Sequence, residues 1–144
     1  MITFVIPGQP VAKGRPRFAR RGAHVVAYTP EKTMSYESLV KTLAAEQMNA
    51  LGLPPSAKPI SLEIVLRLQI PASWSKKRRE MARIGQIRAT KKPDADNVLK
   101  GIKDACNGIV WRDDSQVINI GLHKEYSETP FVRVRVMECL GESA

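Results

Sequence analysis

The sequence predicts an α/β (α+β) fold in which helices pack against one mixed β-sheet, within a single domain that covers residues 1–144. The length of 144 residues is enough for one domain with a sizeable core. Hydrophobic residues make up 43% of the chain, which is ordinary for a globular protein. The predicted elements follow the order strand, strand, helix, strand, short helix, helix, strand, strand, which is typical of helices layered on a sheet.

Three strands and one long helix are predicted in the first half of the chain. The strands are ITFVIP (2–7), HVVAY (24–28) and ISLEIVLRLQIP (60–71). A basic loop with several Pro and Gly residues (8–24) joins the first two strands. Thr29 and Pro30 suit the N-cap and first position of a helix that Gly52 and Pro54 end. The apolar face of this helix repeats at helical spacing and consists of Tyr36, Leu39, Val40, Leu43, Ala44, Met48 and Leu51.

Two helices and two strands are predicted in the second half. A second basic segment (75–92) begins with a short helix, for which Ser73 or Ser75 is the predicted cap. The clearest helix follows Pro93 and ends at Gly108. Its apolar stripe consists of Val98, Leu99, Ile102, Ala105, Cys106 and Ile109. The two last strands, which we expect to be adjacent, are QVINIGLHKEY (116–126) and FVRVRVMEC (131–139).

Positive charge is concentrated in two parts of the chain. The net charge is +9, the first thirty residues contain no acid, and eight basic residues accompany one acid between Lys76 and Lys92. A small domain this basic is typical of a partner of nucleic acid, with a membrane surface as the second candidate. Loop Arg and Lys residues contact phosphates without reading base sequence. The predicted DNA-binding residues are Lys13, Arg15, Arg17, Arg20, Arg21, Lys76, Lys77, Arg78, Arg79, Lys91 and Lys92.

Several classes of protein are excluded by what the sequence lacks. No apolar run reaches the roughly 18 residues of a spanning helix, and the N-terminus has no signal-peptide pattern, so we expect a cytoplasmic protein without a membrane partner. Cys106 and Cys139 have no CxxC spacing and are interpreted as small buried residues rather than a disulfide. His24 and His123 are isolated, which argues against a histidine-based metal site.

The negative charge is even more localised than the positive charge. All five aspartates lie within a window of 21 residues and are Asp94, Asp96, Asp104, Asp113 and Asp114. Like charges so close together repel unless Lys, Arg or a divalent metal neutralises them. Mg²⁺ binds carboxylate and water oxygens together with substrate phosphate. In phosphodiester hydrolysis such an ion makes a bound water more acidic, polarises a phosphoryl oxygen and stabilises charge on the leaving oxygen. The window is therefore a candidate Mg²⁺ site.

The stretch KKPDADNVLK places two of these aspartates at the start of the clearest helix. Pro93 disfavours helical backbone at the residue before it, so the chain bends there. This bend allows the carboxylates of Asp94 and Asp96 to converge, with Asp96 at or near the N-cap. Asp96, Lys100 and Asp104 are four residues apart and share one stripe, where the lysine suits stabilisation of transition-state charge.

Two interpretations of these acids remain equally open on physical grounds. In one, the aspartates bind metal, although Asp113 and Asp114 follow a helix that ends roughly 16 Å from its start. The chain must then carry them back toward Asp94 and Asp96. In the other, Asp96 caps the helix, Asp94 is a favourable anion at its N-terminus, Asp104 forms a surface pair with Lys100, and the two adjacent acids belong to a turn.

The segment KKPDADNVLKGIKDACNGIVWRDDSQV resembles the core signature of the RusA family of Holliday-junction resolvases, small endodeoxyribonucleases often carried by phages and prophages. The matching features are D-x-D-N, a lysine four residues after the second Asp, D-A further along the helix, and D-D-x-Q-V after a tryptophan. The segment PGQPVAKGRPRF also resembles the N-terminal part of many members. The likeness covers about two thirds of the chain, and it is only general between Ser56 and Thr90.

The resemblance implies an α/β fold with a mixed sheet and a homodimer that nicks four-way junction DNA symmetrically with Mg²⁺, for which Mn²⁺ is a possible substitute. It implies metal-binding catalytic aspartates at Asp94, Asp96 and Asp114 and a functional lysine at Lys100. Possible supporting residues are Asp113, Asp104 and Asn97. Two alternatives are a non-catalytic basic nucleic-acid-binding module and a nuclease for another branched or hybrid substrate.

Overall fold

Four strands form one mixed sheet in this protein. The structure, a computed structural model, describes residues 1–13, 17–21, 24–28 and 31–144, and side chains in 1–13 and 35–144. The strands, in spatial order, are β1 (Ile2–Pro7), β6 (Phe131–Glu138), β4 (Ile60–Gln69) and β5 (Val117–Ser127). β4 runs parallel to β5 and antiparallel to β6, and β6 runs antiparallel to β1. The mixed sheet confirms the predicted fold class.

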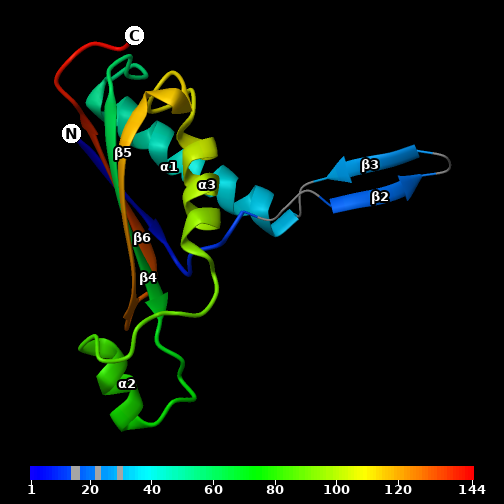
Figure 1. Cartoon of the computed structure of the whole chain (residues 1–144), viewed down its shortest axis with the longest axis vertical. Helices are drawn as coiled ribbons and strands as arrows, with labels where there is room; N and C mark the ends of the chain where they lie inside the picture. Colours follow the sequence, from blue (N-terminus) through cyan, green and yellow to red (C-terminus); the bar gives the residue numbers. More distant parts are fainter. Residues whose placement is uncertain (14–16, 22–23, 29–30) are drawn as a thin grey trace.

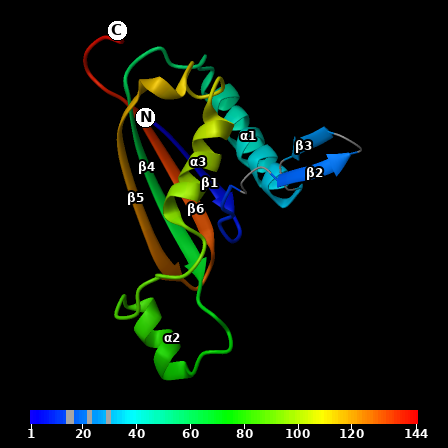
Figure 2. The same ribbon diagram turned by 45° about the vertical axis from the view of Figure 1, so that its right-hand side comes forward.

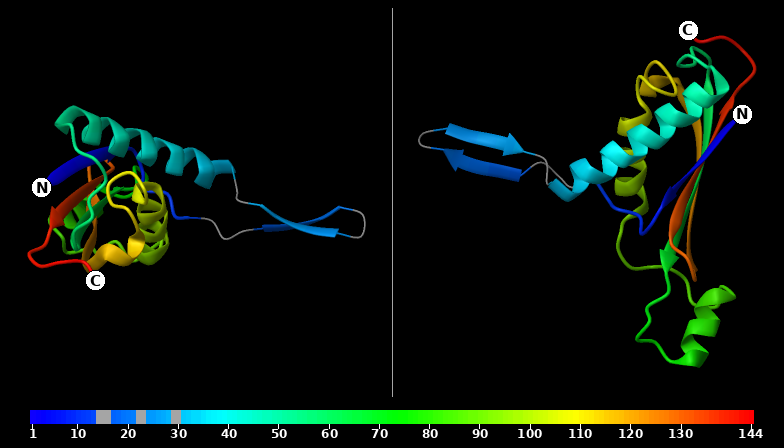
Figure 3. Two further views of the ribbon diagram at one scale, coloured as in Figure 1. Left: turned by 90° about the horizontal axis from the view of Figure 1, so that it is seen from above. Right: turned by 180° about the vertical axis from the view of Figure 1, so that it is seen from behind.

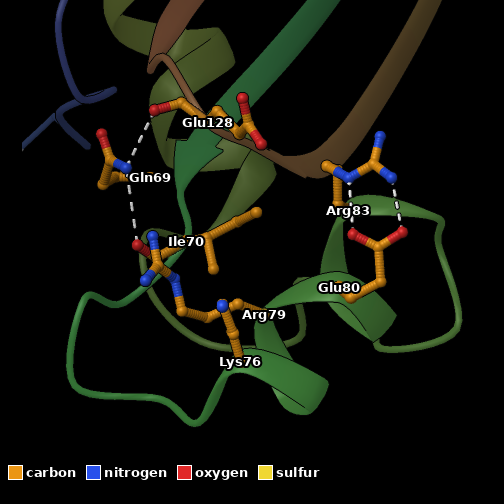
Figure 4. Close-up of a pocket in the computed structure, with 7 residues that line it drawn as sticks. All are labelled: Gln69, Ile70, Lys76, Arg79, Glu80, Arg83 and Glu128. Atoms are coloured by element: carbon orange, nitrogen blue, oxygen red, sulfur yellow. Dashed lines mark hydrogen bonds and ion pairs between the residues drawn. The ribbon is translucent and has the colours of Figure 1, made fainter.

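The expectation that the last two strands are adjacent is wrong, because β4 lies between β5 and β6. β4 is buried along most of its length, since Ile60, Leu62, Ile64, Leu66 and Leu68 are all buried, and this suits the centre of a sheet. The short connection from β5 to β6 passes across the end of β4. There the Gln69 side-chain amide donates to the Glu128 carbonyl at 2.9 Å and holds the connection in place (Figure 4).

Two helices cover one face of the sheet, which Figure 1 shows nearly edge-on. They are α1 (Glu31–Leu51) and α3 (Ala95–Cys106). The core lies between these helices and the inward side chains of the strands, and includes Ile6, Val40, Leu62, Ile64, Ile102, Trp111 and Val134. Leu39 and Leu51, which the predicted apolar face of α1 included, are exposed instead. The predicted start of α1 at Thr29 and Pro30 lies outside the described residues.

Two smaller elements extend from this core, as Figures 2 and 3 show from several sides. The helix α2 (Lys76–Arg83) lies beyond the end of β4, and Ser75 is its N-cap, because the Ser75 hydroxyl accepts from the Arg78 amide at 3.2 Å. The strands β2 (Arg17–Arg21) and β3 (His24–Tyr28) pair as an antiparallel hairpin. The prediction that residues 8–24 form only a loop is therefore wrong. A strand such as RFARR depends on its pairing partner more than on its own residue preferences.

None of the helices in the described part of the chain is long and apolar enough to cross a membrane. Both cysteines are free, as predicted. Cys106 is buried in the core, whereas Cys139 is partly exposed, so the interpretation of Cys139 as a buried residue is wrong.

Candidate active site

The helix α3 begins one residue after the first aspartate of the D-x-D-N motif. Asp94 is the N-cap residue, and its carbonyl accepts the first helical hydrogen bond from the Val98 amide at 3.1 Å. Its side chain makes no capping hydrogen bond and has only a long contact of 3.4 Å from the Asn97 amide. Asp96 lies in the first turn. The interpretation of Asp96 as the cap is therefore wrong, and capping uses neither carboxylate.

A groove of about 300 Å³ runs along the exposed side of α3. It is lined by Asp96, Leu99, Lys100, Lys103, Asp104 and Asp114. The predicted stripe of Asp96, Lys100 and Asp104 is thus confirmed as one surface, and Asp114 joins it from outside the helix. Asp94 does not line the groove. Lys103 was missed at the sequence level, although its spacing of three from Lys100 would have placed it on the same side.

Asp114 is held at the groove by a tryptophan of the core. The Trp111 side chain is fully buried, and its indole N–H donates to Asp114 Oδ1 at 2.8 Å. Asp114 opens the short 3₁₀ helix η1 (Asp114–Gln116), which is followed directly by β5. Burial, with a smaller contribution from the negative charge of Asp114, raises the pKa of the Cys106 thiol to about 12. Asp114 lines the same groove as Lys103 and Asp104, which belong to the second half of α3.

The neighbouring Asp113 has a different role, because it caps η1. Its carboxylate accepts from the Ser115 amide at 2.9 Å and from the Ser115 hydroxyl, and these bonds lower the pKa of Asp113. In return, the Asp113 amide donates to the Gln116 side chain at 2.8 Å, which completes a capping box. The amide group of Gln116 also donates to the carbonyls of Ser56 and Lys58 at 2.8 and 2.9 Å, and so ties the turn to the segment before β4.

Asp104 is joined to the loop that leads to the hairpin. The Lys13 ammonium donates to Asp104 Oδ2 at 2.5 Å and lies 3.1 Å from Glu37 Oε1. The Lys13 amide donates to the Asn97 carbonyl at 3.1 Å, so the loop contacts α3 through backbone and side chain. The hydrogen bond to Asp104 is the main reason that the pKa of Lys13 is raised. Two carboxylates thus engage the charge of Lys13, which was predicted to contact DNA, and the described ion pairs join Asp104 to Lys13 instead of to Lys100.

The basic residues of the second segment lie on α2 and on the loop between α2 and α3. Lys76 and Arg79 line a cavity of about 440 Å³, where Arg83 pairs with Glu80 (Figure 4). Arg78 stacks over the Trp74 ring at 4.3 Å from its centroid. Lys76, Lys77, Arg78, Arg79, Lys91 and Lys92 are all exposed. Arg15 lies outside the described residues, and Arg17, Arg20 and Arg21 belong to β2, where side chains are not described.

The carboxylate oxygens around the groove are the type of ligand that a hard cation such as Mg²⁺ prefers. Within the described side chains, no three His, Cys, Asp or Glu residues lie close enough together to hold a metal ion alone. Asp96 and Asp114 nevertheless present carboxylates to one groove, and Trp111 engages only one oxygen of Asp114. Mg²⁺ commonly takes one or two carboxylates and completes its coordination with water and substrate phosphate. The residues therefore fit a cation that binds together with a phosphate.

A small basic α+β protein with carboxylates and lysines in one helical groove has the features of an enzyme that acts on phosphodiesters. The model of a family described as Endodeoxyribonuclease RusA matches residues 7–137, and the chain belongs to that family. The chain is also 37% identical, over 139 residues, to a protein of Bacillus subtilis (strain 168) named "Uncharacterized protein YqaN", with 95% of this chain and 96% of that protein covered. Membership implies an endonuclease, which is a hydrolase.

Proposed function

We propose that this protein is a divalent-metal-dependent endonuclease that resolves four-way DNA junctions by paired symmetric nicks. The observation that carries the proposal is the groove in which Asp96, Lys100 and Asp114 come together from two separate segments of the chain. Membership of the RusA family supports the reaction class, because the family is one of endodeoxyribonucleases. The excess of basic residues supports a polyanionic substrate.

The residues of the groove have distinct tasks in this proposal. Asp96 and Asp114 would hold Mg²⁺, or Mn²⁺ in its place, and Asp94 is the further metal-binding aspartate that the family resemblance implies. The bound cation would supply a more acidic water and charge stabilisation at the phosphate. Lys100 lies one turn after Asp96 on the same side of α3, so its ammonium stabilises negative charge that develops on the phosphate oxygens. Trp111 keeps the Asp114 carboxylate oriented toward the groove.

The elements that extend from the core supply the contacts to the junction arms. α2 carries four consecutive exposed basic residues, 76–79, and the hairpin carries three arginines in β2. Figures 1 and 2 show these two elements at different sides of α3, so one duplex arm can contact each of them while the phosphate between them enters the groove. Two such subunits related by a two-fold axis match the two symmetric cuts, which is why we propose a homodimer.

Cleavage of a synthetic four-way junction tests the proposal. The wild-type protein is expected to cut the junction with Mg²⁺ and not with EDTA, and to prefer it over a flap or an RNA–DNA hybrid in the same reaction. Asp96→Asn and Lys100→Met are expected to lower the rate at least about 100-fold while binding persists, as for groups that act mainly in the transition state. Glu63→Gln, on the opposite face of the sheet, is the matched control.

Normal cutting by Asp96→Asn would refute the metal site at this groove. Binding without any cleavage by the wild-type protein would favour a non-catalytic nucleic-acid-binding module. Preferential cleavage of the flap or the hybrid would keep the nuclease and change its substrate.

A further inference from the structure

A lysine of β5 contacts the segment that leads into the D-x-D-N motif. The Lys124 ammonium donates to the Lys91 carbonyl at 2.5 Å and to the Pro93 carbonyl at 2.9 Å. More than thirty residues of sequence separate Lys124 from these two carbonyls. The two hydrogen bonds therefore fix the loop before α3 to the edge strand of the sheet.

The position of Lys124 in its strand explains how it reaches this loop. Lys124 pairs with Leu66 of β4, and paired residues of adjacent strands point to the same side of a sheet. Leu66 is fully buried beneath the helices, and Leu122 and Tyr126 of the same β5 stripe pack against the core. Lys124 is thus a lysine in a row of apolar residues on the helix-covered side. Its ammonium does not pack with these apolar side chains but donates to the backbone carbonyls of Lys91 and Pro93.

The bond to Pro93 acts directly on the first aspartate of the motif. The Pro93 carbonyl and the Asp94 amide belong to one planar peptide unit, so a hydrogen bond that fixes the carbonyl also fixes the orientation of that unit. Asp94 is the N-cap of α3, and the helix that starts there carries Asp96 into the groove. Lys124 thereby constrains the backbone from which both carboxylates project.

The charge of Lys124 is not used in an ion pair with any described side chain. The ion pairs in the part of the chain with described side chains involve Lys13, Arg67, Arg83 and Arg135 and do not include Lys124. Hydrogen bonds from an ammonium to carbonyl groups are stronger than those between neutral groups. The Lys124 ammonium therefore bonds two backbone carbonyls and no described carboxylate, which indicates that it holds the loop before α3 in place.

We propose that Lys124 is a positioning residue of the active site, which sets the geometry of Asp94 and Asp96 by holding the carbonyls of Lys91 and Pro93. This proposal rests on the proposed function for the consequence in catalysis, but its structural part stands apart from it. Lys124 acts through the loop backbone and does not itself contact the phosphate.

The test combines hydrogen exchange, Mn²⁺ binding and junction cleavage in three variants of the full-length protein. Lys124→Met has a side chain of similar length but lacks the ammonium N–H donors, whereas Lys124→Arg keeps the positive charge and N–H donors. Arg135→Met is the control, because it removes one charge from the opposite face of the sheet. In Lys124→Met, we expect faster amide exchange within 91–98, Mn²⁺ binding weakened about 10-fold and cleavage slowed about 10–100-fold, the scale of groups that orient metal ligands. Junction affinity measured in EDTA is expected to stay within about threefold, since no phosphate contact is lost.

Rescue separates positioning from general stability. Lys124→Arg is expected to recover most of the exchange protection and Mn²⁺ affinity, whereas Arg135→Met is expected to match the wild type in all measurements. If Lys124→Met does not fold, Lys124→Gln replaces it, because its shorter amide does not reach both carbonyls.

Three results would overturn the proposal: unchanged exchange within 91–98, unchanged Mn²⁺ affinity despite faster exchange, or a loss of junction affinity as large as the loss of cleavage. The last result would make Lys124 a DNA contact. If the wild-type protein cuts no DNA substrate, the proposed function fails, while exchange and Mn²⁺ binding still decide the role of Lys124.

Discussion

The indole N–H of Trp111 donates a hydrogen bond of 2.8 Å to a carboxylate oxygen of Asp114, and so joins the core to the candidate active site. Trp111 is fully buried, whereas Asp114 is partly exposed in the groove along α3. A buried ring has little freedom to move, so its N–H is a fixed point from which the carboxylate is oriented. The arrangement resembles a metal ligand held by a partner behind it.

Trp111→Phe tests this orientation, because it keeps an aromatic ring in the core and removes the N–H group. We expect cleavage to fall about 10–100-fold, as for other partners that orient metal ligands. The free energy of unfolding should fall by about 1–3 kcal/mol, from the lost hydrogen bond to a charged group and the smaller ring. Junction cleavage rates and urea denaturation measure the two effects. Wild-type cleavage by a folded Trp111→Phe protein would show that Asp114 needs no such support.

The adjacent acids Asp113 and Asp114 are expected to differ in what their loss costs. Asp113→Ala removes the cap of η1 and should destabilise the protein by about 1 kcal/mol, with cleavage retained within a few-fold. Asp114→Ala should abolish cleavage, and its effect on thermal unfolding should be small in comparison with this loss of activity. Thermal unfolding and junction cleavage of both variants make the comparison. An equal loss of cleavage in the two variants would argue that the capping box, rather than one carboxylate, is what the site requires.

The sequence was informative where one residue type determines a local outcome. Alternating apolar residues predicted β4, Ser75 is one of the two predicted caps of α2, and the spacing of Asp96, Lys100 and Asp104 predicted a shared surface. These features depend on neighbours within a few residues. They were therefore accessible to periodicity and capping rules.

The features that escaped prediction depend on contacts distant in sequence. The central place of β4 between β5 and β6 follows from competition among strands for burial, which no single strand reveals. The return of Asp114 to α3 depends on where the core places Trp111. Lys124 left a usable signal, since it is the one lysine in the apolar stripe of Ile120, Leu122 and Tyr126, but its carbonyl partners could not be named from sequence.

The ion pair between Lys13 and Asp104 is expected to contribute to stability more than to DNA binding. Both side chains are partly buried, and the short contact couples the hairpin loop to α3. A double-mutant cycle with Lys13→Met and Asp104→Asn should give a coupling energy of about 0.5–3 kcal/mol, the range for residues in direct contact. Urea denaturation of the four proteins provides it. Additive effects would indicate that the pair is formed too rarely in solution to matter.

Salt dependence should distinguish Lys13 from the basic residues of α2. Lys77 is exposed and is in none of the ion pairs between described side chains. Lys77→Gln should therefore lower the magnitude of the slope of log affinity against log salt concentration by about 0.9, the value for one lost phosphate contact. Lys13→Met should leave this slope nearly unchanged, because two carboxylates already engage its ammonium. Junction binding in EDTA at several salt concentrations measures both slopes. A reduced slope in Lys13→Met would mean that DNA displaces the carboxylates.

Cys106 should make the fold sensitive to alkaline pH. Burial, with a contribution from Asp114, raises the pKa of its thiol from 9.0 to about 12 in the folded protein. Between these values the unfolded chain has lost the thiol proton and the folded chain retains it, so the unfolded state binds fewer protons and the free energy of unfolding falls as pH rises. Urea denaturation at pH 8 and pH 10.5 should show a smaller decrease for Cys106→Ala than for the wild type. The raised pKa of Tyr36, about 12 through burial, acts in the same direction in both proteins and leaves this difference intact. Equal decreases in the two proteins would mean that the thiol ionises as readily in the folded state as in the unfolded chain.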